Sequence, residues 1–314
     1  MYAANAMWNW QISPKLTLTN AVRFDYLMLG FAGSLATGSK FTLADYNNAR
    51  LSEPSVNSGL VYKPTDEDTF RLLASRGIQA PSLADFGVHL SNTLAGVPIT
   101  FAGSPRLKAA SVENVEIDYD RVVAPINALL RTAVYYQETD DLLTSAVNAP
   151  LLLGPGGLSG YSPNVGSSSA AGGEISLKGA SESGMRWKVS YALISIADRL
   201  LLAPLRGHSS VLDYRHGAPA SVVELGAGYS WDRIEIDGQA RWQSRFTDYF
   251  PSVTGVIVPF QVNNYVTINA RIGYRVTEGL TLAVAGGKLG QAQIFQAAGV
   301  PVERRVTVSL TDRY

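Results

Sequence analysis

The sequence predicts an all-β fold, an antiparallel up-and-down transmembrane β-barrel. Apolar and polar residues alternate in about thirteen runs along the 314-residue chain, and this alternation is the period of a β-strand. The connections between these runs go strictly short, long, short, long. Charged residues make up only 17% of the chain, below the roughly 25% of ordinary soluble domains. No window holds the 18 or so consecutive apolar residues of a membrane helix, so a membrane would be crossed by strands.

The run Ile234–Phe246 shows the pattern most clearly. Ile234, Ile236 and Trp242 share one parity with small residues, whereas the other parity is wholly polar and charged. A strand with these two faces lies between two different solvents. Thirteen residues at about 3.3 Å each would span roughly 43 Å, whereas soluble strands usually have about 3 to 10 residues. Lipid outside and an aqueous lumen inside therefore explain this run better than a soluble sheet does.

The other runs repeat the pattern in chain order. The first is Ala3–Ile12, and in the second, Leu16–Met28, Val22 and Phe24 oppose Arg23 and Asp25. The clearest later runs have the same two faces and cover residues 114–120, 126–137, 186–194, 222–231, 266–276 and 303–314.

The connections predict how the strands are joined. Short turns of Pro, Gly and polar residues occur at 13–14, 65–67, 124–125, 181–184, 232–233 and 277–279. Long connections alternate with them and cover approximately 30–53, 77–109, 138–170, 199–217, 247–263 and 290–302. A meander of this kind places all short turns at one end and all long loops at the other, as in outer-membrane barrels.

Aromatic residues indicate where a membrane interface would lie. Seven of them cluster near the short-turn ends of their strands, as expected for an interfacial girdle: Trp8, Trp10, Tyr62, Trp187, Tyr229, Trp231 and Tyr274. The 26 basic and 26 acidic residues balance, so the charge gives no reason to expect nucleic acid as a partner. The chain has no cysteine, which excludes disulfides and thiolate metal sites.

The number of strands and the direction of the first and last runs predict how much of a barrel this chain forms. Single-chain bacterial barrels have an even number of strands and both termini on the periplasmic, short-turn side. The first and last runs of this chain both descend from the long-loop end. We therefore expect the chain to be the C-terminal part of a longer barrel.

Several segments, in order, resemble the TonB-dependent outer-membrane receptors. Ser75–Gly87 (SRGIQAPSLADFG) is similar to their S-R-G-F-x-A-P-x-L segment, and Ser104–Asp120 resembles their N-P-x-L-K-P-E landmark, with Ser104 in place of Asn. Gly172–Gly179 is similar to their G-x-E strand. The end, Glu303–Tyr314, resembles their closing strand, although Tyr314 stands where Phe is usual, and 280–290 departs from the family's N-L-F/Y-D element.

The resemblance implies a 22-stranded barrel with an N-terminal plug, of which this chain would supply the last thirteen strands. Residues 1–314 would then be a partial TonB-dependent receptor β-barrel without a plug domain. The implied function is TonB-dependent uptake of a nutrient such as a siderophore, cobalamin or a saccharide, in the bacterial outer membrane. The implied partners are the lipid bilayer and lipopolysaccharide, the nutrient ligand, the barrel assembly machinery, and the TonB complex through a plug. No cofactor is expected.

The polar parity predicts a water-filled lumen with charged walls. Its residues either neutralise one another and hold a plug by ion pairs or, near the long loops, touch ligand. The charged members are Arg23, Asp25, Arg71, Glu116, Asp118, Arg131, Glu224, Arg241, Arg245 and Arg271. We predict ligand contacts at the long-loop end because aromatic and Arg side chains give much contact energy per residue, and these residues are Tyr135, Gln137, Arg245, Tyr249, Phe250 and Tyr265.

Other function classes find little support in the sequence. Zincin, nucleophile-elbow and phosphate-loop motifs are absent, so an enzyme is not expected. A rim hydrolase would have to use His208 with Ser209 or Ser210 and with Asp140 or Asp141, and their spacing does not favour it. His208 and His216 are more simply solvated loop residues than metal ligands. A passive porin or a remnant barrel without active transport remains the main alternative.

Two Gly-, Ser- and Asn-containing segments are predicted to be surface loops. Residues 149–173 are rich in Gly, Ser and Pro, which is typical of a mobile loop, and residues 33–51 are similar in kind. Loops of this kind on a rigid scaffold often determine which ligand is bound.

Overall fold

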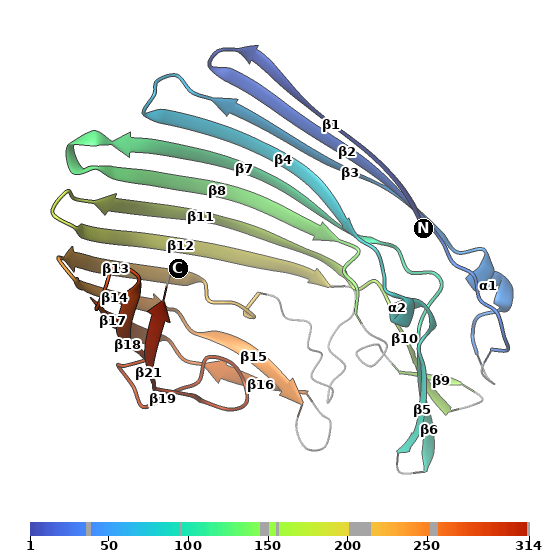
Figure 1. Ribbon diagram of the computed structural model, residues 1–314. Helices are drawn as coiled ribbons and strands as arrows, with labels where there is room; N and C mark the ends of the chain where they lie inside the picture. Colours follow the sequence, from blue (N-terminus) through green and yellow to red (C-terminus); the bar gives the residue numbers. More distant parts are fainter. Residues whose placement is uncertain are drawn as a thin grey trace.

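The computed structural model describes residues 1–35, 39–94, 96–144, 151–154, 157–200, 215–251 and 257–312. Its main element is an antiparallel sheet of thirteen strands, arranged in the order in which they occur along the chain (Figure 1). This number and order confirm the prediction from the alternating runs. The strands are β1 (Tyr2–Ser13), β2 (Leu16–Met28), β3 (Arg50–Tyr62), β4 (Asp68–Gln79), β7 (Ala110–Val123), β8 (Ala128–Asp140), β11 (Gly166–Ala180), β12 (Met185–Leu200), β13 (Ser221–Trp231), β14 (Ile234–Gln243), β17 (Tyr265–Arg275), β18 (Leu280–Gly287) and β21 (Arg305–Asp312).

The sheet curves into a wall with two different ends (Figure 1). All six short turns lie at one end, and the described parts of the long connections lie at the other, as the alternating turn lengths predict. The two-residue turn between β13 and β14 places Asp232 at φ 50°, in the left-handed region that Asp and Asn tolerate better than most residues. We call the two ends of the wall the short-turn end and the long-loop end.

One face of the wall is apolar from strand to strand. Ile236 of β14 pairs with Ile272 of β17, Ile272 with Val284 of β18, and Val284 with Val308 of β21. Each of these four side chains is between 45% and 66% exposed. Soluble monomers rarely expose apolar side chains as a contiguous row across several strands. This face therefore suits lipid, and we call it the lipid-facing side.

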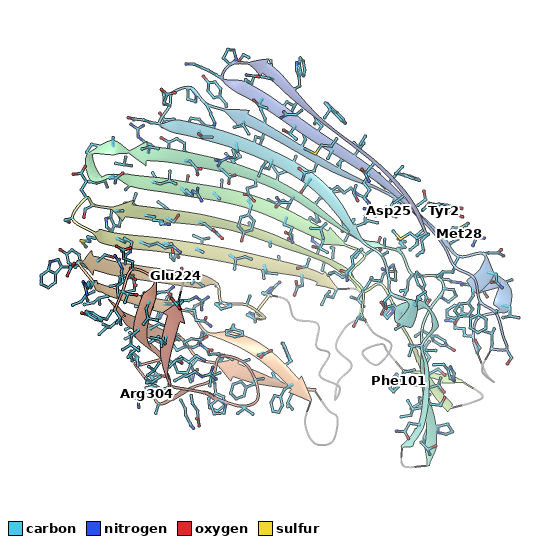
Figure 2. All side chains as sticks on the ribbon, in the orientation of Figure 1. Tyr2, Asp25, Met28, Phe101, Glu224 and Arg304 are labelled. Atoms are coloured by element: carbon cyan, nitrogen blue, oxygen red, sulfur yellow. The ribbon has the colours of Figure 1, made fainter. Side chains whose placement is uncertain are left out.

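The opposite face carries the charges predicted from the sequence parity. Glu224 of β13 pairs with Arg241 of β14, and Asp237 of β14 pairs with Arg271 of β17. Between β1 and β12 both faces carry side chains that no second layer of the described residues covers (Figure 2). We call the charged face the lumenal side.

The wall is open at both edges. β1 and β21 stand at the ends of the sheet, and no strand in the described part of the chain pairs with their outer edges. The two α-helices among the described residues are five residues long, and neither is long and apolar enough to cross a membrane.

The long connections contain ordered structure of their own. Among the described residues they form two short helices and three small sheets, β5-β6-β10-β9, β15-β16 and β19-β20. Their elements are α1 (Leu43–Asn47), α2 (Leu83–Gly87), β5 (His89–Leu94), β6 (Val97–Ala102), β9 (Leu152–Gly154), β10 (Gly157–Tyr161), β15 (Phe246–Pro251), β16 (Ile257–Val262), β19 (Gln293–Ile294) and β20 (Val302–Glu303), while the turn from β7 to β8 holds the 3-10 helix η1 (Ala124–Ile126).

These connections also hold most of the buried apolar residues. The buried hydrophobic side chains of the described residues are Phe41, Tyr46, Phe86, Ala102, Leu107, Ala109, Ala110, Ala128, Val165, Val262, Ala283 and Ile294. Only Ala110, Ala128 and Ala283 lie in strands of the wall. The packed core of the described structure therefore lies at the long-loop end rather than in the wall.

Two sequence expectations need correction. Residues 149–173 are more ordered than a surface loop, because their described part contains β9, β10 and the first eight residues of β11. Pairing of β11 with β8 up to Ser168 and Thr139 fixes the β11 part of this segment in the wall, whereas β9 and β10 belong to a separate small sheet. The run Ile234–Phe246 is two strands instead of one: β14 ends at Gln243, and β15 begins at Phe246 as part of a separate hairpin.

Candidate functional site

A belt of ion pairs follows the lumenal side near the short-turn end. Arg71 Nη2 of β4 lies 2.8 Å from Asp120 Oδ2 of β7, and Arg131 Nε of β8 lies 3.8 Å from the same oxygen. Asp118 and Glu174 help to line a cavity of about 440 Å³ beside them. Opposite charges are therefore interleaved across neighbouring strands, so that both cations of this part of the lumen lie beside a carboxylate.

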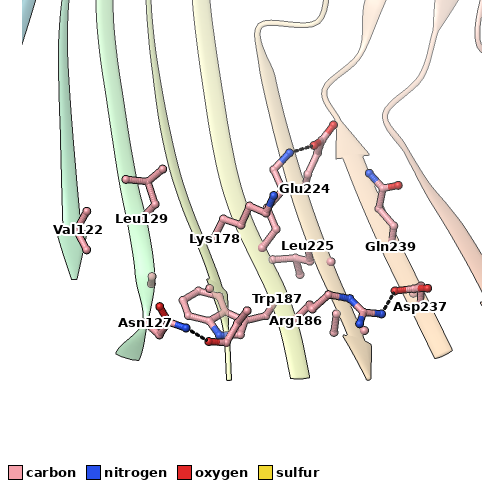
Figure 3. Close-up of a pocket in the computed structure, with 18 residues that line it drawn as sticks. Val122, Asn127, Leu129, Lys178, Arg186, Trp187, Glu224, Leu225, Asp237 and Gln239 are labelled. Carbon is pink, nitrogen blue, oxygen red and sulfur yellow. Dashed lines mark hydrogen bonds and ion pairs between the residues drawn. The ribbon is translucent and has the colours of Figure 1, made fainter. Parts of the chain in front are cut away.

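The belt continues across the C-terminal strands. Arg186 Nη2 of β12 lies 2.9 Å from Asp237 Oδ1 of β14 (Figure 3). Lys188 Nζ lies 2.9 Å from Glu224 Oε2, and Arg271 Nη1 lies 3.2 Å from a Glu235 oxygen. A cavity of about 640 Å³ lies against this wall. The arrangement agrees with the interpretation that lumenal charges neutralise one another.

Tyr135 and Gln137, two of the predicted ligand residues, lie together on β8. Both face the lumen, because Tyr135 pairs with Glu116 of β7 and Gln137 pairs with Asn114. The Cζ and hydroxyl end of the Tyr135 side chain lies over Gly172 of β11, where an added Cβ would come within 2.4 Å of both atoms. Glycine at this position lets the tyrosine lie along the wall, with its hydroxyl available beside the lumen.

Tyr265, Tyr249 and Phe250 form a second group at the long-loop end. Tyr265 begins β17, pairs with the buried Gln243, and places its hydroxyl beside Arg241 and Gln296. Tyr249 and Phe250 lie on β15, in the hairpin that precedes β17. Phe250 contacts Phe260 edge to face, with ring centroids 6.4 Å apart, and Phe260 contacts Phe295 at 5.3 Å.

The structure therefore brings the predicted ligand residues together in two groups instead of one. Five strand-to-strand steps separate β8 from β17, and at about 4.8 Å a step the two groups lie roughly 24 Å apart along the wall. Arg245 lies in the link between β14 and β15 rather than on a strand. Its expected lumenal parity therefore does not apply, because strand alternation ends at Gln243.

Sequence analysis missed a third group, which ties three long connections together. Phe41 lies between Tyr46 and Tyr161, with ring centroids 6.3 Å and 5.3 Å away, and both contacts are edge to face. The Lys40 backbone N–H donates to the Tyr161 hydroxyl at 3.2 Å. The Arg106 guanidinium stacks on Phe41 at 5.6 Å. The group therefore joins the connections 29–49, 80–109 and 141–165.

Two copies of one short motif position the helices of this region. Thr42-Leu-Ala-Asp-Tyr46 forms α1, and Ser82-Leu-Ala-Asp-Phe86 forms α2. In each copy the Thr or Ser hydroxyl accepts from the Asp backbone N–H, and the Asp carboxylate accepts from the Thr or Ser backbone N–H. This reciprocal arrangement is a capping box, and its [ST]-x-x-D spacing is a signal in the sequence from which both helices could have been found.

Two side chains of α1, Asp45 and Tyr46, have pKa values shifted from their ordinary ones. The backbone N–H of Thr42, its hydroxyl and Arg106 hold the pKa of the Asp45 carboxyl below its usual value, against a smaller opposing effect of burial. Arg106 Nη2 lies 3.3 Å from Asp45 Oδ1, so that Asp45 both caps α1 and binds the connection before β7. Burial raises the pKa of the Tyr46 hydroxyl.

The residues considered for metal binding or hydrolysis do not form a site in the described part of the chain. His208, Ser209 and Ser210 lie outside the described residues. Asp141 lies 3.4 Å from Lys108 Nζ, as an ion pair at the surface. No group of three or more His, Asp or Glu side chains with metal-binding geometry occurs among the residues that are described.

A model of the family described as TonB dependent receptor-like, β-barrel, matches residues 1–288. This chain belongs to the TonB-dependent receptor family. A comparison with curated proteins finds no match. Members of the family are outer-membrane β-barrels that act as receptors and transporters, and the thirteen-stranded antiparallel sheet of this chain agrees with that fold.

Solved structures agree with the family. The FrpB iron transporter from Neisseria meningitidis (F5-1 variant) superimposes with a TM-score of 0.70 at 12% identity, over 99% of this chain and 45% of that one. The ferric enterobactin receptor PfeA from Pseudomonas aeruginosa, as a double mutant, superimposes with a TM-score of 0.71 at 15% identity, over 99% of this chain and 44% of that one. The siderophore receptor PirA from Acinetobacter baumannii superimposes with a TM-score of 0.69 at 14% identity, over 99% of this chain and 45% of that one.

These likenesses show the fold of the TonB-dependent receptors and no more, because the identities are low. The chain spans less than half the length of the receptors it matches. The ion-pair belt and the three groups at the long-loop end are the features of this chain from which its own role can be argued.

Proposed function

We propose that this chain is the ligand-facing half of an outer-membrane receptor for TonB-dependent uptake of a small nutrient, with a ferric siderophore as the leading class. The observation that carries the proposal is the wall itself, which has an apolar lipid-facing side and an ion-paired lumenal side over thirteen strands. A wall with these two sides, closed into a barrel, encloses a polar passage across a bilayer. The structural neighbours, an iron transporter, a ferric enterobactin receptor and a siderophore receptor, support the ligand class.

Ligand capture is assigned to the long-loop end. Tyr135 and Gln137 offer a hydroxyl and an amide on one side of the lumen, and Tyr265 with Arg241 offers a hydroxyl and a cation on the other. A separation of roughly 24 Å along the wall lets a ligand bridge the two groups only if further loops complete the vestibule. Arg245, Tyr249 and Phe250 contribute from the link and hairpin that precede β17.

The short-turn half of the lumen is assigned a different role. Its cations and carboxylates are already paired with one another, as in Arg71–Asp120 and Arg186–Asp237. A paired wall offers hydrogen-bonding surface without attracting a charged ligand strongly, which suits contact with a plug domain. The plug and its TonB partner would be supplied by parts of the receptor other than residues 1–314.

Uptake by the full-length receptor in cells tests the proposal. Iron-limited cells that depend on this receptor should accumulate a ferric siderophore from a panel of catecholate and hydroxamate types, and dissipating the proton gradient should stop it. The double variant Tyr135→Phe with Gln137→Leu should weaken binding, whereas Gln11→Leu, on the lumenal parity of β1 near the short-turn end, should not.

The passive-barrel alternative gives the opposite result. A porin or remnant barrel would admit small solutes without regard to the proton gradient, and no siderophore of the panel would bind tightly. Gradient-independent entry of every solute tested would therefore replace the receptor proposal.

A further inference from the structure

One cross-strand row of residues on the lumenal side contains no carboxylate. It begins at Val122 of β7, which pairs with Leu129 of β8, and Leu129 pairs with Lys178 of β11. Lys178 pairs in turn with Lys188 of β12, and Lys188 pairs with Gly226 of β13. Figure 3 shows Val122, Leu129 and Lys178 on successive strands of the wall. Two lysines that lie directly opposite each other repel, so this row is not balanced by its own members.

The row continues to the open edge of the wall. Gly226 pairs with Gln239 of β14, and Gln239 pairs with Asn269 of β17. Gly287 of β18 follows, where an added Cβ would lie 3.6 Å from Asn269 Oδ1, and Gly287 pairs with Arg305 of β21. Over nine strands the row thus presents three cations and two amides. We call it the carboxylate-free row.

The carboxylates on either side of the row are already paired. Glu224 Oε2 lies 2.9 Å from Lys188 Nζ, and Glu224 Oε1 lies 3.5 Å from Arg241 Nε. Asp237 likewise lies between two arginines, whose nitrogens are 2.9 Å and 3.7 Å from its oxygens. Each of these carboxylates therefore contacts two cations, and neither balances a further positive charge in the row.

Two cations of the row are exceptions to the pairing of the lumenal charges. In the part of the chain that the structure describes, neither Lys178 nor Arg305 takes part in an ion pair. Lys178 is the more informative of the two, because both strands beside it are present and give it Leu129 and Lys188 as cross-strand partners. An anion that balances Lys178 therefore has to come from within the lumen.

The row runs from one end of the wall to the other beneath two adjoining cavities. Val122 lies beside the short turn after β7, whereas Arg305 is the first residue of β21 after a long connection. Barrel strands are tilted, so a row across them runs obliquely through the membrane. Cavities of about 640 Å³ and about 380 Å³ lie over its two halves, and both are lined by Gln239. Gly226 and Gly287 have no side chains, which lets a ligand approach the backbone closely.

We propose that the carboxylate-free row is the path by which an anionic small molecule crosses the lumen, with Lys178 as its binding point near the short-turn end. Ammonium, guanidinium and amide groups all donate hydrogen bonds, and bonds to charged oxygens are the stronger ones. Asp118 and Glu174, which both pair with Ala133 in another lumenal row, repel the same ligand. The inference rests on the proposed function, because it specifies the nutrient as a molecule with net negative charge on carboxylate or phenolate oxygens.

Charged thiol reagents measure the potential along the row without any nutrient. The chain has no cysteine, so in the full-length receptor Gln239→Cys places a reporter on the row, and Asn57→Cys places one on the lumenal side of β3, away from it. The rates of modification by an anionic ethylsulfonate and a cationic trimethylammonium methanethiosulfonate are compared, with adducts located by mass spectrometry. We expect the anionic-to-cationic rate ratio to be about fivefold or more higher at position 239 than at position 57, because a surface of one charge sign concentrates counter-ions.

Removal of the two unpaired cations is the matched test of this ratio. Lys178→Gln with Arg305→Gln should bring the ratio at position 239 close to that at position 57, and it should leave position 57 unchanged. Equal ratios at the two positions in the natural charge background would overturn the path. Failure of position 239 to react with either reagent would also overturn it, because another part of the receptor would then cover the row.

Exchanging amides for acids of nearly the same shape tests passage itself. Gln239→Glu with Asn269→Asp adds two carboxylates to the row, and Asn269→Asp keeps the oxygen that accepts from the Lys288 backbone N–H at 3.1 Å. The control, Gln11→Glu with Asn57→Asp, adds two carboxylates to the lumenal side of β1 and β3. An anionic ferric siderophore should bind the first double variant at the cell surface as before, while its uptake should fall by about tenfold. The control should keep both binding and uptake.

Unchanged uptake in the first double variant would overturn the path even if the receptor transports siderophores. If instead no form of the receptor binds a siderophore, the proposed function fails, and the thiol-reagent ratio still decides whether the row attracts anions. The two proposals therefore fail separately.

Discussion

The wall and the connections at its long-loop end are stabilised in different ways. In the wall, side chains such as Ile236 and Val308 remain exposed on one face while Glu224 and Arg271 line the other, so little surface is buried within the chain. In the connections, Phe41, Phe86 and Leu107 are almost fully buried. The wall therefore depends on its hydrogen-bonded ladders and on lipid, whereas the connections depend on a packed core of ordinary kind.

The connections 29–49, 80–109 and 141–165 behave as one packed body, which we call the loop assembly. β6 pairs in parallel with β10, across two different connections. Asn164 Nδ2 donates to the Asp141 carbonyl at 2.7 Å and to the Lys108 carbonyl at 3.1 Å. Contacts between separate connections give the long-loop end a fixed shape, and a fixed shape lets loops select a ligand.

The largest effect should come from emptying the core of the loop assembly. Phe86 is 3% exposed, and Phe86→Ala should cost about 3–5 kcal/mol because it loses both burial and packing. The free energy of local opening can be measured by hydrogen exchange of the amides in residues 80–109. Leu83→Ala on the same helix, where the side chain is 80% exposed, should change it by less than about 0.5 kcal/mol. Equal costs at the two positions would show that the loop assembly has no core.

The wall should respond to charge on one face only. Ile236→Arg should destabilise the folded state in lipid by about 2–4 kcal/mol near the bilayer midplane, while Gln239→Arg on the lumenal side should be nearly neutral. Denaturant titration of the reconstituted receptor measures both values. Equal sensitivity at the two positions would contradict the assignment of one face to lipid.

The sequence predicts the wall well because its signal is local. Ile236 and Glu235 differ in environment only through strand alternation, and a period of two can be recognised from a few neighbouring residues. Turn length adds the order of the strands, since Asp232-Arg233 can only join adjacent antiparallel strands. The limit of this signal is shown by Arg245, where the polar alternation continues although the strand has ended.

The loop assembly was not predictable in the same way. Phe41 meets Tyr161 from a position 120 residues away in the sequence, and Lys108 meets Asn164 from another connection. Contacts of this kind depend on the wall to bring the connections together, and no periodicity marks them. The two capping motifs at Thr42 and Ser82 were visible, but a five-residue helix has too few residues for an apolar period to support it.

Removing the N-cap side chain of α1 or α2 should have a smaller effect, which again is confined to the loop assembly and leaves the wall unchanged. Thr42→Ala and Ser82→Ala should each cost about 1 kcal/mol of local stability, because one helix N–H loses its side-chain acceptor. The exchange rates of the Asp45 and Asp85 amides report each loss. Thr42→Ser and Ser82→Thr keep the hydroxyl and should stay close to the natural protein, while a similar loss in these variants would point to packing rather than capping. Amides of β14 should be unaffected by any of the four changes.

The smallest effect should be a difference between the two regions in their response to acid. The Asp45 carboxyl has a pKa below the ordinary 3.8, chiefly because the Thr42 backbone N–H donates to it. A group whose pKa is lowered on folding adds stability above its unfolded pKa and loses it as pH falls through the folded value. Opening of α1, followed by hydrogen exchange and corrected for the intrinsic rate, should therefore become easier below about pH 4. Asp45→Asn should open more readily at neutral pH and lose this dependence. If α1 of the natural protein were as stable at pH 3 as at pH 7, the Asp45 carboxylate would not be what joins α1 to Arg106, and the loop assembly would be held by its apolar contacts alone.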